Sequence, residues 1–110
     1  MSREHLGLMQ GTVDVLILKT VSGGMMHGYG ISRWIRDRSE GALLVEDAAL
    51  YQALHRIERK GWVESEWGLS DANRRAKYYR ITRDGRKALQ THVADIRTYV
   101  EALMRVLQPA

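Results

Sequence analysis

The sequence contains no cysteine and a single proline, Pro109. Without cysteine the chain forms no disulfide, thiolate zinc site, iron–sulfur cluster or cysteine nucleophile. No apolar run approaches the roughly 18 residues that a membrane span needs, so no membrane partner is expected. Residues 1–10 lack the basic and long apolar regions of a signal peptide. These absences predict a cytoplasmic protein.

Basic charge is concentrated in the middle of a chain whose 110 residues fit one domain. Residues 54–87 carry ten Lys and Arg against five Asp and Glu, whereas residues 1–53 have a net charge of −1 and residues 88–110 of 0. A local basic patch suits a polyanionic partner, although a solvated face can have the same composition. The patch consists of Arg74, Arg75, Lys77, Arg80, Arg83, Arg86 and Lys87.

Apolar spacing predicts three helices in the first half of the chain. They cover residues 10–22, 28–39 and 48–60. In the third helix Leu50, Leu54 and Ile57 fall at i, i+4 and i+7, so they are expected in the core. Asp47 is the expected N-cap of this helix. The apolar stretch 42–45 is expected to form a short strand just before it.

Two strands are predicted in the second half of the chain, because residues 62–67 and 76–81 alternate in polarity. The polar segment 68–75 joins them as a hairpin tip. Trp62 and Trp67 belong to the strands and are expected in the core.

A last helix is predicted over residues 86–107, with Thr82 as its cap. Six of its apolar residues have alternating spacings of four and three, which is typical of a coiled-coil seam. Because so short a chain has nothing else to cover this seam, the economical partner is a second copy, and we expect a homodimer. The predicted dimerisation residues are Leu89, Val93, Ile96, Val100, Leu103 and Leu107.

The expected fold is mostly α with a small β-hairpin: a winged helix-turn-helix over residues 1–82 and a dimerisation helix over residues 83–110. In such a fold the third helix enters the major groove of DNA, whose base edges carry the sequence code. The basic hairpin lies along the adjacent backbone or minor groove. Double-stranded DNA is therefore the expected partner.

Motifs across about residues 8–90 resemble those of the PadR family of bacterial transcriptional regulators. They are Met26-His27-Gly28-Tyr29-Gly30-Ile31, Leu50-Tyr51 with Ala53-Leu54-His55-Arg56-Ile57-Glu58, Gly61-Trp62-Val63, and Asn73-Arg74-Arg75-Ala76-Lys77-Tyr78-Tyr79-Arg80-Ile81-Thr82 with Gly85. The resemblance, with the length of the small subfamily that has one C-terminal dimerisation helix, implies a homodimeric repressor that binds operator DNA. It also implies that residues near the start of the third helix contact DNA. Many family members are released from DNA by a small molecule.

The chain departs from the family pattern at the start of the third helix. Members commonly have Gly-Ser or Gly-Thr before the Leu-Tyr pair and a Pro after it, whereas this chain has Ala49 and Gln52 there. A hydroxyl is absent at position 49, and the Gln52 amide suits bidentate pairing with adenine. The operator of relatives is therefore not transferable. The candidate DNA-binding residues are Ala49, Tyr51, Gln52, His55, Arg56, Arg74, Arg75, Lys77 and Tyr79.

Two interpretations stay open for several of these residues. Tyr51 either contacts DNA through its hydroxyl or packs as core. Gln52 and His55 share a helix face with Ala48 and Arg59, and that face is either turned to the groove or merely solvated.

The basic residues at the base of the hairpin also have two possible roles. Arg80 and Arg83 either contact phosphate or pair with an acidic neighbour. The candidate neighbours are Glu64, Glu66 and Asp84.

Catalytic and metal-binding patterns are not found in the sequence. No serine lies in a glycine-flanked elbow, and Gly28-Tyr29-Gly30 lacks the third glycine and the preceding strand of a nucleotide-binding loop. We therefore expect no enzyme activity and no catalytic residue. The histidines lack metal-ligand spacing, so neither a metal nor a cofactor is expected, and His27 is expected at a helix start or in the core. The histidines are His5, His27, His55 and His92.

Two other functions stay open. A small-molecule sensor would bind an aromatic or drug-like inducer at the dimer interface, where the last helix offers only Tyr99 as an aromatic residue. A protein-binding module would need an exposed apolar patch, which the sequence does not locate. Leu6, Leu8 and Met9 are candidates to pack across the dimer.

Overall fold

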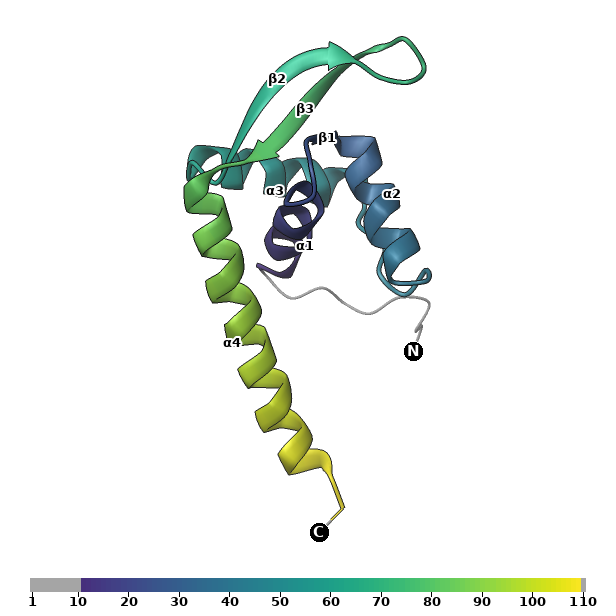
Figure 1. The fold of residues 1–110 in the computed structure, drawn as a ribbon. Helices are drawn as coiled ribbons and strands as arrows, with labels where there is room; N and C mark the ends of the chain where they lie inside the picture. The colour runs from purple at the N-terminus through teal and green to yellow at the C-terminus, as the bar shows by residue number, and fades with distance from the viewer. Residues whose placement is uncertain (1–10, 110) are drawn as a thin grey trace.

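The computed structural model describes residues 11–109 and contains four helices and three strands in that range. The predicted packing of Leu6, Leu8 and Met9 across a dimer lies outside the described residues. Figure 1 shows three helices and a hairpin gathered at one end, with the last helix extending away from them. The elements are α1 (Thr12–Val21), β1 (Met26–His27), α2 (Gly28–Arg38), α3 (Asp47–Arg59), β2 (Val63–Leu69), β3 (Arg75–Ile81) and α4 (Arg83–Leu107).

The core lies between α1, α2, α3 and the inner face of the sheet. The predicted core residues of α3 are confirmed, since Leu50, Leu54 and Ile57 are at most 1% exposed. They pack with Ile17 and Leu18 of α1 in one cluster. Burying branched aliphatic side chains from three helices in this way fixes which face of α3 remains outside.

The start of α2 agrees with the sequence-based prediction, whereas the start of α3 differs from it. His27 begins α2 as expected, because its Nδ1 accepts a hydrogen bond of 3.0 Å from the backbone N–H of Gly30. The prediction that Asp47 caps α3 is wrong: Glu46 holds the cap position, without a side-chain bond, and Asp47 is the first helical residue. Its carboxylate there still faces the positive end of the helix dipole.

The short strand lies before α2 and not before α3. Segment 42–45 has no regular structure, and β1 instead pairs antiparallel with β3, giving the sheet order β1-β3-β2. A two-residue strand has no periodicity of its own, so only its partner β3 defines it. Within segment 42–45, Val45 packs in the core, where it is 6% exposed.

Thr82 begins α4 as predicted and joins it to the base of the hairpin. Its Oγ1 accepts from the Gly85 N–H at 3.0 Å and donates to the carbonyl of Gly61 at 2.6 Å. Its own N–H donates to the Trp62 carbonyl at 3.0 Å. The boundary proposed between residues 82 and 83 coincides with this cap, and its status as a domain boundary stays a prediction.

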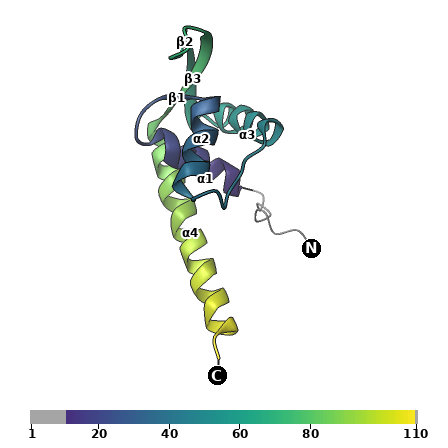
Figure 2. The same cartoon turned by 90° about the vertical axis from the view of Figure 1, so that its right-hand side faces the viewer.

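The molecule is elongated because α4 projects beyond the other elements (Figures 1 and 2). Its radius of gyration is 15.3 Å, against about 13 Å for a compact chain of this length. Within residues 11–109, no helix combines the length and hydropathy that crossing a bilayer requires. Three helices followed by an antiparallel hairpin, with a long terminal helix, make the winged helix-turn-helix expected from the sequence.

Candidate nucleic-acid interface

The outer face of α3 is polar and open to solvent. Ala48, Gln52, His55 and Arg59 are all exposed, as expected for residues at i, i+4, i+7 and i+11 opposite the buried stripe. Ala49 beside them is also exposed. The helix therefore presents an amide, an imidazole and a guanidinium on one side, with small side chains at its start.

Tyr51 combines features of both interpretations open for it. Its side chain is 45% exposed, so it is not a core residue. Its ring nevertheless packs against the start of α2, where a Cβ placed on Gly28 would lie 2.5 Å from the Tyr51 hydroxyl. Glycine at position 28 thus makes room for the tyrosine. Contact of the hydroxyl with DNA stays a prediction.

Arg56 forms an ion pair within the protein, and its contact with DNA stays a prediction. Its Nη2 lies 2.6 Å from Asp14 Oδ1 and its Nε 3.2 Å from Asp14 Oδ2, a bidentate pair between α3 and α1. Asp14 is 5% exposed. The hydrogen bond to Asp14 raises the pKa of the Arg56 guanidinium. The guanidinium compensates a buried charge, while its side chain remains 37% exposed.

Tyr79 is also corrected, because the structure buries it. Its side chain is 5% exposed within the core cluster, on the sheet face that meets the helices. Burial, together with the negative charge of Glu58, raises the pKa of its phenol. The alternation of side chains along β3 places Tyr79 and Lys77 on the same face of the strand. Only the position of α3 shows that the part of this face at Tyr79 is covered.

The base of the hairpin is an ion-paired surface. Arg80 donates to Glu66 at 2.6 Å and to Glu64 at 2.9 Å, and the hydrogen bonds to Glu66 and then Glu64 raise the pKa of its guanidinium. Of its two possible roles, the structure therefore favours pairing. Lys77 lies further toward the tip, opposite Trp67, with its Nζ 3.8 Å from a Glu58 carboxylate oxygen.

The hairpin tip retains its positive charge. Among residues 11–109, Arg74 and Arg75 have no carboxylate oxygen within 4.0 Å, and the same holds for Arg83 at the base of the hairpin. Trp67 lies beside Arg75 and is 58% exposed, so the prediction that it is a core residue is wrong. The outer half of the hairpin extends past the helices, so a side chain there has nothing to bury against. Trp62, nearer the base, packs against the core as expected.

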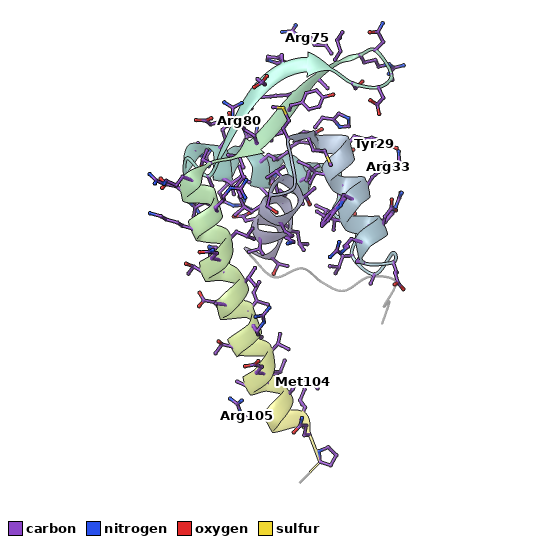
Figure 3. The ribbon with its side chains drawn as sticks, in the orientation of Figure 1. Tyr29, Arg33, Arg75, Arg80, Met104 and Arg105 are labelled. Atoms are coloured by element: carbon purple, nitrogen blue, oxygen red, sulfur yellow. The ribbon has the colours of Figure 1, made fainter. Side chains whose placement is uncertain are left out.

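Two residues that the sequence analysis did not select lie at the start of α2. Tyr29 is 66% exposed and the Arg33 guanidinium lies 5.6 Å from the centre of its ring. Figure 3 shows both on α2, below the end of the hairpin. The one sequence signal for this pair is the basic residue at i+4 from the tyrosine.

The outer part of α4 carries an uncovered apolar face. Ile96, Val100, Leu103 and Leu107 are between 41% and 65% exposed. Leu89, at the start of the predicted seam, is partly buried against the core of its own chain, and its place in a dimer interface stays a prediction. The face also includes exposed residues outside the predicted set, namely Tyr99, Met104 and Val106.

A shallow hollow lies on this part of α4. Its volume is about 300 Å³. The hollow is lined by Val93, Ile96, Arg97, Val100 and Glu101.

Within the described part of the chain, no three His, Cys, Asp or Glu side chains come close enough to hold a metal ion.

Comparison with known proteins identifies the family. Residues 17–91 match the transcriptional regulator PadR-like family. A protein from Lysinibacillus sphaericus, named uncharacterized protein X, is 31% identical over 105 residues, covering 92% of this chain and 95% of that protein. The structure of a transcriptional regulator from Clostridium thermocellum is 28% identical, with a TM-score of 0.82 over 90% of this chain and 96% of that one.

A structure with bound DNA shares the fold at lower identity. The crystal structure of Bacillus subtilis PadR in complex with operator DNA is 16% identical, with a TM-score of 0.68, and the match covers 77% of this chain and 48% of that one. At this identity the likeness concerns the fold alone. Because the family match spans more than half of its residues, the chain belongs to the PadR-like family of transcriptional regulators.

Proposed function

We propose that this protein is a cytoplasmic, homodimeric repressor that binds operator DNA through α3 and the hairpin. The observation that carries the proposal is the joint exposure of two polar surfaces. One is the outer face of α3, and the other is the hairpin tip, where Arg74 and Arg75 have no carboxylate partner among residues 11–109. That B. subtilis PadR, which shares the fold, was crystallised with operator DNA supports the same partner here.

The outer face of α3 supplies base recognition. The major groove accepts one helix, and each base pair presents a distinct donor and acceptor pattern there. Gln52 is suited to adenine through its amide, while His55 lies one turn further along the same face. Ala49 brings the helix start close to the groove without adding a polar contact. Tyr51 contacts the edge of the site while its ring rests on α2.

The hairpin tip supplies backbone contacts. Arg74 and Arg75 neutralise phosphates next to the groove, and Lys77 adds charge nearer the base of the hairpin. Tyr29 and Arg33 of α2, which lie below the end of the hairpin, contribute a further backbone contact. Such contacts fix the register of the protein on the duplex without reading sequence.

Dimerisation uses the uncovered face of α4. Large apolar side chains exposed along one stripe of a helix are typical of an interaction surface, and their alternating four-and-three spacing suits a second helix of the same kind. A two-fold axis along α4 presents two α3 helices to successive turns of DNA, about 34 Å apart. Occupation of an operator by this dimer blocks transcription.

The proposal is tested by fluorescence anisotropy at about 150 mM salt, where non-specific contacts weaken. One labelled duplex is the region upstream of the protein's own gene, and the other is a shuffled copy. A specific repressor binds the first at least about 10³-fold more tightly. Weak, equal and salt-sensitive binding to both duplexes contradicts operator recognition at that locus.

A second function, response to a small aromatic inducer, is favoured by the hollow on α4. The hollow has about 300 Å³ and an apolar lining that includes Ile96 and Val100, with Tyr99 exposed nearby. In a dimer, the partner helix would cover it and leave a slot for a planar molecule. Titration with planar aromatic compounds, followed by release of labelled operator, tests this function. Operator affinity that stays constant for every compound bound counts against it.

A further inference from the structure

We propose that Trp67 and Arg75 act as one DNA-contacting unit. The indole ring rests against the sugar edge of bound DNA, and it holds the Arg75 guanidinium in position for a phosphate. This inference rests on the proposed function and adds a positioning residue to it. In this arrangement Trp67 is an apolar contact and a support, while Arg75 supplies the charge.

The first observation is the exposure of two large apolar side chains near the hairpin tip. Trp67 is 58% exposed and Leu69 66% exposed, and both lie on the same face of β2. Nearer the base of the hairpin, this face carries Ser65, which donates to Glu58 of α3 at 2.6 Å, and buried Val63. The face therefore runs continuously from the core into solvent, with its largest side chain uncovered.

The second observation is the geometry of the pair. The strand register places Trp67 opposite Lys77 and Leu69 opposite Arg75, so Arg75 is the diagonal neighbour of Trp67. The Arg75 guanidinium carbon lies 4.5 Å from the centre of the indole ring. A stacked guanidinium keeps its N–H groups free at the edge, where they can bind phosphate with two hydrogen bonds.

Arg80 shows why this support matters. Both arginines are held in place on the same strand, but Arg80 is held by Glu64 and Glu66, which neutralise its charge. An aromatic ring restricts the side chain and leaves the charge intact. Arg75 is therefore ordered and still positive, which lowers the entropy lost when it binds an anion. Figure 3 shows Arg75 near the end of the hairpin and Arg80 at its base.

The surroundings of Trp67 favour DNA as the occupant of this surface. Between residues 67 and 77 the chain has three basic residues and one acidic residue, Asp71. An apolar ring surrounded by cations matches a polyanion that also offers apolar sugar edges. The tip thus combines positive charge, which suits the phosphates of a nucleic-acid backbone, with an apolar surface, which suits its sugars.

The experiment uses full-length variants in which Trp67 is the only tryptophan, made with Trp34→Phe and Trp62→Phe. Titration with the upstream duplex should change the Trp67 emission and protect it from acrylamide quenching. A matched variant that keeps only Trp62 should show neither effect, because Trp62 packs against the core and α4. Operator binding without any change at Trp67 overturns the inference and leaves the proposed function standing.

A double-mutant cycle tests whether the pair acts as a unit. Trp67→Ala should weaken operator binding about 5- to 30-fold, since each of two wings loses an interaction of ordinary cation–π strength. Arg75→Lys keeps the charge but loses the planar stack, so adding Trp67→Ala to it should remove only the contact of the indole with the sugar and lower the affinity by less than Trp67→Ala does alone. Full additivity of the two losses, or unchanged affinity of Trp67→Ala, overturns the inference. Failure of every duplex to bind the wild-type protein overturns the proposed function as well.

Discussion

Arg56 on α3 and Asp14 on α1 form a bidentate ion pair across 42 positions of sequence, with contacts of 2.6 and 3.2 Å. Asp14 is 5% exposed, whereas the Arg56 side chain is 37% exposed. The pair joins the helix proposed to read DNA to the helix that contacts α4. It therefore fixes the orientation of α3 from its buried side.

Removing one partner of this pair should destabilise the protein. Arg56→Ala leaves the buried Asp14 carboxylate without its charge partner, and we expect a loss of about 1–3 kcal/mol in the free energy of unfolding. Arg59→Ala is the matched control, because Arg59 is exposed on the same helix and has no ion pair within the described residues. Urea unfolding measures both variants. Equal stability of the two would contradict a structural role for Arg56.

Gly85 should not tolerate alanine. A Cβ at this position would overlap the Trp62 carbonyl, which also accepts the Thr82 N–H at 3.0 Å. Gly85→Ala forces the start of α4 away from the base of the hairpin, so we expect a loss of about 1–3 kcal/mol. Gly23→Ala is the matched control, because the atom nearest to the added Cβ lies 3.8 Å away. Its midpoint of thermal unfolding should be nearly unchanged. A small effect of Gly85→Ala would show that this junction can shift freely.

Arg75 and Arg80 should differ in their contribution to DNA binding. Arg75→Ala removes a charge that has no carboxylate partner in the described part of the chain. The slope of log affinity against log salt should therefore fall by about one unit per lost phosphate contact in each wing. Arg80→Ala removes a charge that Glu64 and Glu66 already neutralise, so its slope should stay close to wild type. Anisotropy titrations from low to physiological salt measure the slopes. An unchanged slope for Arg75→Ala would remove the tip from the mechanism.

Gln52 should affect sequence preference more than general affinity. Gln52→Ala removes a side-chain amide on the exposed face of α3 and leaves the backbone contacts intact. We expect discrimination between the upstream duplex and single-base variants of it to fall by about 1–3 kcal/mol at one position. Binding to random DNA serves as the control and should be preserved. Equal losses on specific and random duplexes would argue against base recognition by this residue.

Leu103 should be required for dimerisation. Its side chain is 42% exposed on the apolar face of α4, and Leu103→Glu would place a charge in the proposed seam. We expect a monomer in sedimentation velocity and a large loss of operator affinity. Thr98→Glu, on the other side of the same helix, should remain dimeric. A dimer that survives Leu103→Glu would locate the interface elsewhere.

Features that depend on neighbouring residues were predicted from the sequence. The spacing of Leu50, Leu54 and Ile57 indicated the buried side of α3, and the same periodicity placed Gln52 on the exposed side. The cap at Thr82 was predictable because a hydroxyl bonds to an amide three residues on. Local periodicity also revealed the long terminal helix.

Features that depend on distant partners were decided only by the tertiary structure. The strand Met26–His27 forms only because it pairs with β3. Arg56 forms its ion pair with Asp14, which lies on another helix. Trp67 is exposed because the helices end short of the hairpin tip. Sequence periodicity shows which side chains share a face, but it does not show what covers that face. Burial and charge pairing depend on groups that lie far apart in the chain, so they appear only when the chain is folded.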